Sequence, residues 1–137
     1  MALMDNFTIM GSAMRAQTIR MNTTASNLAN VDSYGASEQT TYRARQPVFA
    51  ALLDSAFSEN PGVGVTVSKI VEKPGDLEKK HEPGHPLADA QGYVFVPNVN
   101  IIEEMTNMIS ASRSYQTDVE VLNSTKQMIS ALLRLGE

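Results

Sequence analysis

The sequence predicts an α+β fold in which long N- and C-terminal helices pair as a coiled-coil-like core and carry a small β-rich insertion between them. All eight methionines lie in the terminal parts of the chain, whereas all six prolines lie between Pro47 and Pro97. Apolar residues repeat every seven positions in both terminal parts, which is the spacing of a helical seam. The ends and the middle of this 137-residue chain are therefore built differently.

The terminal helical domain is expected to span residues 1–32 and 98–137. In its N-terminal part, the pattern predicts a helix of about 25 residues that ends near Val31. Its main apolar row consists of Phe7, Met14, Met21 and Leu28. Gly11 weakens the first turns, and the polar run from Asn22 to Asn30 has low helix propensity. Packing against other helices must therefore supply much of the stability.

The C-terminal part predicts one helix of about 35 residues from Asn98 to Leu135, because no Gly or Pro interrupts it. The first apolar row is Ile101, Met108, Tyr115, Leu122 and Ile129, and the second row is Met105, Ser112, Val119, Lys126 and Leu133. Asn98 or Asn100 can cap the first turn, where Glu103 and Glu104 suit the positive end of the helix dipole.

Two interpretations of this helix pair are open on the pattern alone. An ordinary intramolecular hairpin would leave its outer face in water. A pair packed among the helices of neighbouring subunits would bury that face, and the scarcity of charged residues on both helices favours this second arrangement.

The middle segment, residues 33–97, is expected to be β-rich. Alternating residues from Val63 to Val71 predict the clearest strand. A second strand is expected at Tyr93–Val96 and a third at Thr40–Phe49, where Pro47 marks an edge or a strand end.

Two parts of the middle segment are expected to lack strands. Phe49–Phe57 is compatible with a helical turn or two, and the Pro- and Gly-containing stretch 72–89 predicts a long exposed loop. That loop holds the letters of the zinc-protease motif H-E-x-x-H from His81 to His85. Pro83 and Gly84 argue against the helix that would aim both histidines at a metal, so a solvated loop is the preferred interpretation.

Composition excludes several classes of function. The net charge is −4 and no cluster of Lys and Arg is dense enough for nucleic acid. Without Cys there are no disulfides or thiolate metal sites, and no phosphate-binding or nucleophile motif occurs. We therefore expect no enzyme activity, no cofactor and no metal. We also expect no direct membrane insertion and no cleaved signal peptide.

Both terminal parts are similar to one known family. The run Ala16–Val31, with the pattern A-x-N-L-A-N at Ala25–Asn30, resembles the N-terminal signature of bacterial flagellar rod, hook and hook-associated proteins. Several C-terminal segments resemble the C-terminal signature of the same group: Gly92–Asn100, Glu103–Met105, Ala111–Gln116, Asn123 and Lys126. Asp118 stands where the group most often has Asn. The short length is similar to that of proximal-rod members, because distal-rod and hook members have much longer middle domains.

The resemblance implies a structural subunit of the rod, which crosses the periplasm as a drive shaft, transmits torque and encloses the export channel. Its implied partners are other copies of itself, other rod proteins, the MS ring, the rod-base adaptor and the flagellar type III export apparatus. It also implies export without a cleaved signal peptide. A helical adaptor or export chaperone that caps another protein is the alternative function.

Helical assembly of such subunits would proceed through the terminal helices. The residues expected at the subunit interface are Met14, Met21, Asn27, Leu28, Asn30, Ile101, Met105, Met108, Tyr115, Leu122, Ile129 and Leu133.

Overall fold

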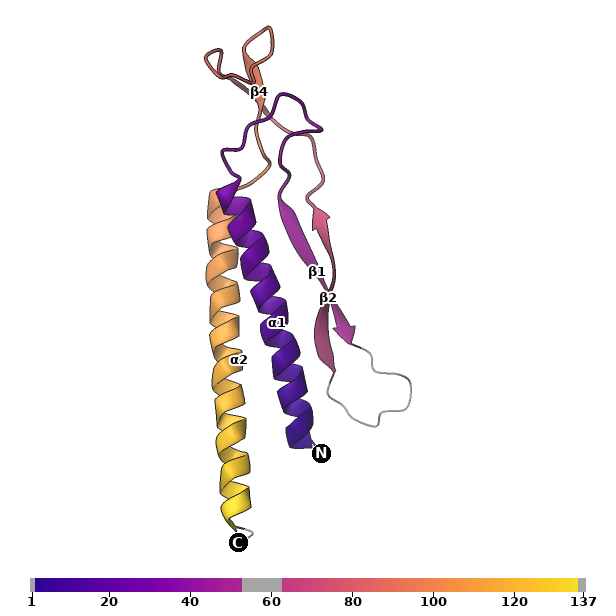
Figure 1. Ribbon diagram of the computed structural model, residues 1–137, viewed down its shortest axis with the longest axis vertical. Helices are drawn as coiled ribbons and strands as arrows, with labels where there is room; N and C mark the ends of the chain where they lie inside the picture. The colour runs from indigo at the N-terminus through magenta and orange to yellow at the C-terminus, as the bar shows by residue number, and fades with distance from the viewer. Residues whose placement is uncertain (1, 53–62, 136–137) are drawn as a thin grey trace.

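The computed structural model describes residues 2–52 and 63–135 of the chain. It confirms the expected α+β architecture: two long antiparallel helices run along most of an elongated molecule, and small β elements lie beside them and at one end (Figure 1). Helix α1 spans Ala2–Ala29 and helix α2 spans Ile101–Leu135. Both helices therefore agree with the predicted bounds to within three residues at the ends facing the middle segment.

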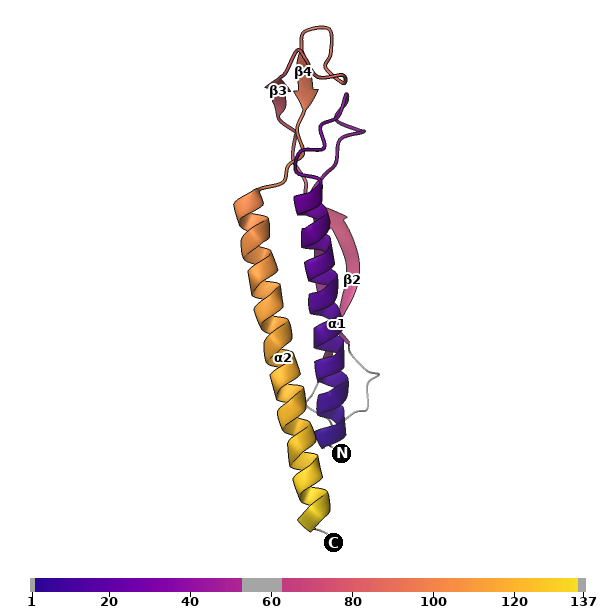
Figure 2. The same cartoon turned by 60° about the vertical axis from the view of Figure 1, so that its left-hand side comes forward.

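Helix α1 forms the middle layer of the molecule. Strands β1 (Arg45–Leu52) and β2 (Gly64–Glu72) form an antiparallel ribbon, with a register shift between Val48 and Phe49. Figures 1 and 2 show this ribbon along one side of α1 and helix α2 along another. Among the described helices and strands, α1 is the only one that packs on α2. The two helices and the ribbon consequently meet through α1.

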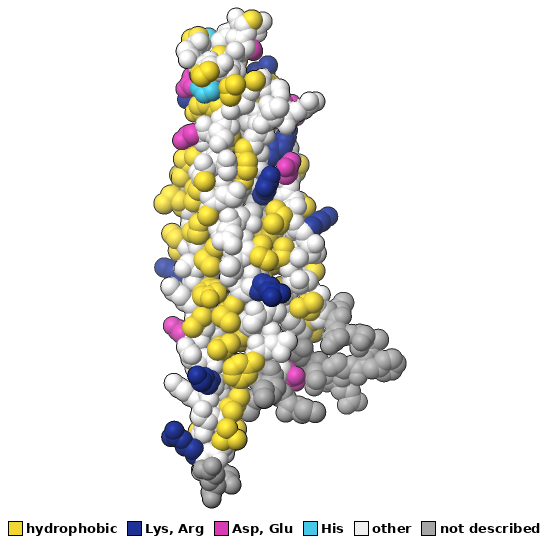
Figure 3. Space-filling view, in the orientation of Figure 1, with side chains coloured by type: hydrophobic (Ala, Val, Ile, Leu, Met, Phe, Trp, Pro, Cys, Tyr) yellow, Lys and Arg dark blue, Asp and Glu magenta, His cyan; other side chains and the backbone are white. Residues whose placement is uncertain are grey.

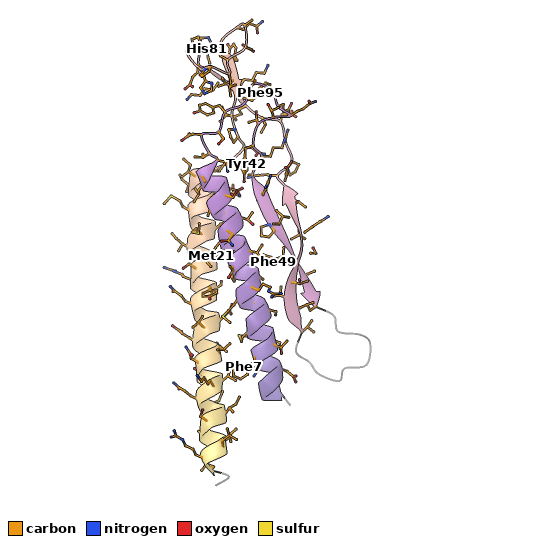
Figure 4. The ribbon with its side chains drawn as sticks, viewed as in Figure 1. Phe7, Met21, Tyr42, Phe49, His81 and Phe95 are labelled. Atoms are coloured by element: carbon orange, nitrogen blue, oxygen red, sulfur yellow. The ribbon has the colours of Figure 1, made fainter. Side chains whose placement is uncertain are left out.

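A small module continues the chain beyond one end of the helices, and we call it the head. Strand β3 (Lys79–His81) pairs antiparallel with strand β4 (Tyr93–Phe95), and Gly35 forms an isolated bridge with Phe95. Val94 in β4 is fully buried. Figure 4 shows His81 and Phe95 in this head, far from Phe7 near the opposite end of the molecule.

Two predicted strands are confirmed and the third is displaced. Strands β2 and β4 lie where alternation and the final aromatic segment predicted them. The strand expected at Thr40–Phe49 begins only at Arg45. The preceding residues form a turn instead, in which the Thr41 hydroxyl donates to the Ser37 carbonyl oxygen at 2.6 Å.

Two expectations for the connecting segments were wrong. The stretch 72–89 is not all loop, because it contains the last residue of β2 and all of β3. Lys79–His81 has no apolar alternation, so only its pairing with β4 makes it a strand. Residues 49–52 belong to β1 and do not form a helical turn, and the rest of the proposed turn, residues 53–57, lies outside the described residues.

Two asparagines, which we call the asparagine clamp, join the helices to the ribbon. The Asn27 side-chain oxygen accepts from the Arg45 backbone N–H at 2.9 Å and from the Tyr42 hydroxyl at 2.8 Å, while its amide donates to the Arg45 carbonyl at 2.9 Å. Asn98 accepts from the Ala44 N–H at 2.8 Å and donates to the Lys73 carbonyl at 3.1 Å. Helix α1 and the approach to α2 are thereby attached to adjoining residues at the start of β1.

Side-chain caps end both helices at the junction with the head. The Asn100 oxygen accepts from the backbone N–H groups of Ile102 at 3.0 Å and Glu103 at 3.2 Å, which confirms Asn100 as the N-cap of α2. At the end of α1, the Asn30 amide donates to the Ser26 carbonyl at 2.9 Å. The polar run of α1 is thus used largely for capping and tertiary hydrogen bonds.

We expect Asn27→Ala to lower the free energy of unfolding by about 2 kcal/mol, because it removes the three hydrogen bonds that the buried Asn27 side chain makes with Arg45 and Tyr42. Asn27 is only 1% exposed, so water cannot replace its amide. Urea unfolding followed by circular dichroism measures the change, and hydrogen exchange should accelerate at the Arg45 amide. Asn22→Ala, at an exposed position of the same helix, is the matched control; equal unfolding midpoints for the two variants would contradict the role of the clamp.

Candidate assembly interface

The face of α2 that packs on α1 is made of small and polar residues. The buried residues of α2 are Glu104, Ala111 and Thr125, at multiples of seven positions. Asp118 falls on the same row and is half-buried. The first predicted apolar row flanks this line, with Met108, Tyr115, Leu122 and Ile129 half-buried. The helix pair inside one subunit therefore has little apolar core of its own.

The sequence placed the second row of α2 at Met105 and every seventh residue after it. The line that actually faces α1 begins one residue earlier, at Glu104. The inner line runs through Glu104 and Ala111, whereas Met105, Lys126 and Leu133 are exposed. The physical reason is that the buried line consists of Glu104, Ala111 and Thr125. A search for large apolar residues does not detect such a line. As positions for contact with another subunit, Met105 and Leu133 remain predictions.

The predicted interface residues on α1 divide into two kinds. Met14, Met21 and Leu28 are half-buried, so part of each side chain remains accessible to a neighbour. Asn27 is buried, and both its oxygen and its amide are already hydrogen-bonded within the chain. Asn30 caps the end of α1. Subunit contacts of Asn27 and Asn30 stay predictions, and the structure gives both residues an internal role.

Large apolar side chains are exposed along α2. Besides the predicted Ile101, Met105 and Leu133, the exposed set contains Ile102, Ile109, Val121, Met128, Leu132 and Leu135. Figure 3 shows hydrophobic side chains along much of the length of the molecule on the α2 side. Sequence reasoning missed these additional residues, although the seven-residue spacing of Ile102 with Ile109 and of Val121, Met128 and Leu135 could have indicated them.

A polar hollow of about 350 Å³ lies where α1, α2 and β1 meet. Glu104, only 4% exposed, lines it together with Arg20 and Arg45. One Arg20 Nη donates to the Asn107 side-chain oxygen at 3.1 Å, which connects the two helices directly. The buried Glu104 side chain and two arginines thus line one hollow between the layers.

Burial raises the pKa of Asp118 above its ordinary value. The charged carboxylate on the inner face of α2 loses hydration, and within the described part of the chain no ion pair involves it. The residue that departs from the resembled signature therefore carries an unfavourable electrostatic contribution at neutral pH.

The two histidines of the H-E-x-x-H sequence pattern, His81 and His85, each lie against a different aromatic ring. The His81 ring lies 5.0 Å from that of Tyr93, and the His85 ring lies 5.6 Å from that of Tyr34. His81 is in strand β3, and the next residues form a turn, so the motif is not on a helix. The described residues include no group of three or more His, Cys, Asp or Glu placed to hold a metal ion.

Within residues 2–52 and 63–135, neither helix is long and apolar enough to cross a membrane. What the site offers is a set of exposed helical surfaces together with internal clamps and caps that hold two helices and a ribbon in a fixed arrangement. Such an arrangement suits contact between proteins.

Comparison with known proteins identifies the class first. Residues 8–36 match the family described as flagella basal body rod protein, and residues 90–135 match the family described as flagellar basal body rod FlgEFG protein C-terminal. The matches cover α1 from residue 8 onward with the turn after it, and β4 with α2. This is the class of proteins whose N- and C-terminal signatures the two ends of the chain resemble.

Relatives along the whole chain identify the family within that class. The flagellar basal-body rod protein FlgC of Salmonella typhimurium is 48% identical over 137 residues, and that of Bacillus subtilis is 36% identical over 150 residues. The FlgC of Buchnera aphidicola from Acyrthosiphon pisum is 43% identical over 139 residues. Each match covers 100% of both proteins. The chain belongs to the FlgC family of flagellar basal-body rod proteins.

We expect Asp118→Asn to stabilise the folded chain at pH 7 by roughly a few tenths of a kcal/mol, since water still screens this partly exposed carboxylate. Burial raises the folded pKa of Asp118 above its unfolded value, so the native state binds more protons. The stability contributed by the protonated form is lost as the pH rises from the unfolded pKa through the folded pKa.

Chemical unfolding at several pH values tests whether the stability contributed by Asp118 falls as the pH rises. The advantage of Asp118→Asn over the parent should disappear below about pH 3.5, where the parent carboxyl is also protonated. Glu120→Gln, exposed on the same helix, should show no such pH-dependent advantage. An advantage of Asp118→Asn that grew as the pH fell would contradict the assignment.

Proposed function

We propose that the chain is a structural subunit of the proximal rod, where α1 and α2 pack with the helices of neighbouring subunits to build the drive shaft. The observation that carries this proposal is the distribution of apolar surface on α2. Its inner line is Glu104, Ala111 and Thr125, while larger apolar residues such as Ile102 and Ile109 are exposed. Burying those side chains against neighbours would stabilise an assembly, at about 25 cal/mol per Å² of apolar surface.

The same distribution favours a helical tube over a closed oligomer. The apolar residues are spread along the length of α2 and are not gathered in one self-complementary patch. A contact between different surfaces of two subunits generates an open helical assembly when the rotation does not close. In such a tube, the terminal domain, residues 1–32 and 98–137, would line the export channel, and the middle segment, residues 33–97, would face outward.

The layered fold suits the transmission of torque. The clamp joins the ribbon to both helices through backbone groups at Ala44 and Arg45, and packed protein interiors have low compressibility. Rotation applied to the helical layer would therefore be passed to the outer ribbon and head with little internal deformation.

Family membership supports the remaining parts of the proposal. Its assembly partners are other copies of the chain and other rod proteins, with the MS ring and the rod-base adaptor at the proximal end. The chain would reach the periplasm through the flagellar type III export apparatus without a cleaved signal peptide. The work is mechanical: no catalytic step, cofactor or nucleic acid takes part in it, and the chain does not insert into a membrane.

We expect Ile109→Asp to abolish rod assembly and swimming while the purified chain keeps its helical content. Ile109 is 54% exposed, so a carboxylate there costs little within the subunit and much in a packed subunit interface. Leu28 and Leu122 are less suitable because both are half-buried within the chain. Complementation of a strain that lacks the chain, scored on soft agar and by microscopy of basal bodies, measures the effect.

Ile109→Leu is the matched control, because it keeps an apolar side chain at the same exposed position. It should leave most swimming intact. Full motility of Ile109→Asp, with rods of normal appearance, would count against packing of this α2 surface in the rod.

A further inference from the structure

Helix α1 has a third side that no described part of the subunit covers. Helix α2 and the ribbon lie along two of its sides (Figures 1 and 2). The exposed residues of the third side recur at alternating intervals of three and four positions, which keeps them on one face of a helix. We call this set the α1 flank, and it consists of Thr8, Gly11, Arg15, Thr18, Asn22, Ala25 and Ala29. Its one charged residue is Arg15.

Gly11, in this flank, is not explained by the subunit itself. Glycine inside a helix is destabilising relative to alanine. The φ angle of Gly11 is not positive, and a Cβ atom built there would meet no atom of the described residues within 4 Å. Neither the backbone conformation nor an internal contact therefore requires glycine. Close approach of a backbone from outside the subunit is the remaining physical use of glycine at such a position.

Helix α2 carries an exposed set with the same spacing, which we call the α2 flank: Thr106, Ser110, Arg113, Thr117, Glu120 and Ser124. One heptad before Ser110 is Glu103, whose carboxylate pairs with the Lys73 ammonium at 3.0 Å just after β2. The α2 flank therefore begins on the ribbon side of α2, whereas the α1 flank is turned away from both the ribbon and α2. The two flanks of one subunit point in different directions and do not meet.

The two flanks match each other in an antiparallel register. Helices α1 and α2 are antiparallel, so α1 of one copy and α2 of another are antiparallel when the copies lie side by side in the same orientation (Figure 1). With Arg15 placed opposite Glu120, the intervals of the two sets coincide. The resulting pairs are Gly11–Ser124, Arg15–Glu120, Thr18–Thr117, Asn22–Arg113, Ala25–Ser110 and Ala29–Thr106. All but two of these pairs join small side chains, and the Asn22 oxygen can accept from the Arg113 guanidinium.

The charges select this register. In residues 2–52 and 63–135 the ion pairs are Arg43–Glu38, Lys73–Glu103 and Lys80–Glu82, so neither Arg15 nor Glu120 has a partner in that part of the chain. Sliding the helices by one heptad would place Arg15 opposite Thr117's neighbour in the set, Arg113, or opposite uncharged Gln127. Opposite charges fix a register and like charges oppose the wrong one.

We propose that the α1 flank of one copy packs against the α2 flank of a second copy that lies beside it in the same orientation. Both halves of the complementary pattern are present on this chain, so the occupant that it specifies is another copy. Because the two flanks differ, each bound copy leaves one flank of each kind free for the next neighbour. The inference rests on the proposed rod function and names the faces through which copies meet.

Disulfide formation tests the contact and its register, because the chain has no Cys. The full-length double variant Thr18→Cys with Thr117→Cys would replace the parent chain in cells, and isolated basal bodies would be oxidised and run on non-reducing gels. A disulfide requires Cβ atoms within about 4.5 Å of each other. The expected products are linked dimers and longer species. Thr18→Cys with Ser124→Cys joins the same flanks one heptad out of register, and as the matched control it should give little product.

Charge exchange in the Thr18→Cys, Thr117→Cys chain adds a second measurement. Arg15→Glu alone and Glu120→Arg alone should each reduce the linked fraction several-fold, because each places like charges opposite one another. The two substitutions together should restore most of the linked fraction. A double exchange that yields no more product than either single change would contradict the pairing.

Gly11→Leu should have opposite effects on the subunit and on the contact. The unfolding temperature of the purified chain should rise, because leucine favours the helix and meets no described atom nearby. The linked fraction should fall several-fold, because the larger side chain separates the flanks. An unchanged linked fraction would overturn the close approach at Gly11.

The outcome is separable from that for rod function. Absence of linked product from basal bodies that assemble and rotate normally would overturn the flank contact and leave the rod function standing. Equal yields in the two registers, or product from Thr18→Cys alone, would also overturn it. The Ile109→Asp experiment tests the rod function independently, because Ile109 belongs to neither flank.

Discussion

The asparagine clamp is the constraint on which the arrangement of the layers depends. Asn27 on α1 binds backbone groups of Arg45, the first residue of β1, and Asn98 before α2 binds the N–H of Ala44, the residue before it. Each net hydrogen bond contributes only about 1 kcal/mol, but leaving a polar group of the buried Asn27 or Ala44 unpaired costs more. Farther along α1, the Ser12 hydroxyl accepts from the Val65 N–H at 3.0 Å, so the ribbon is held at both ends. The direction of the ribbon relative to the helices follows from these attachments.

With the layers fixed by hydrogen bonds, the helix pair needs little apolar core of its own. The inner line of α2 contains Glu104 and Thr125, and the direct link between the helices is the Arg20–Asn107 hydrogen bond. Small and polar side chains let the helices approach while the larger apolar residues point outward. A subunit built in this way gains little free energy from pairing its own helices, and in the proposed assembly it would gain more from the burial of its outer faces.

How far the sequence predicts this structure depends on how local each feature is. Uninterrupted heptads placed both helices, alternation placed β2, and the cap at Asn100 was also foreseen. Strand β3 was missed because Lys79–His81 becomes a strand only through residues that follow it by more than ten positions. The inner seam was assigned to the wrong row, because Glu104 and Ala111 do not look like seam residues until α1 lies against them. The internal role of Asn27 depends on a strand 18 residues away, which no periodicity reveals.

The resembled motifs and the exposed apolar surface therefore perform different tasks. Asn27 and Asn98, both within the matched segments, fix the fold of the subunit. Ile102 and Ile109 are exposed on the same frame and contribute nothing to its hydrogen bonds through their side chains. Changes at such outward positions alter which surface a neighbour meets without disturbing the clamp, whereas changes at the clamp alter the subunit itself. Related subunits that share the clamp but differ at exposed positions of α2 would keep the same fold while presenting different surfaces. This would allow them to pack side by side in one continuous shaft.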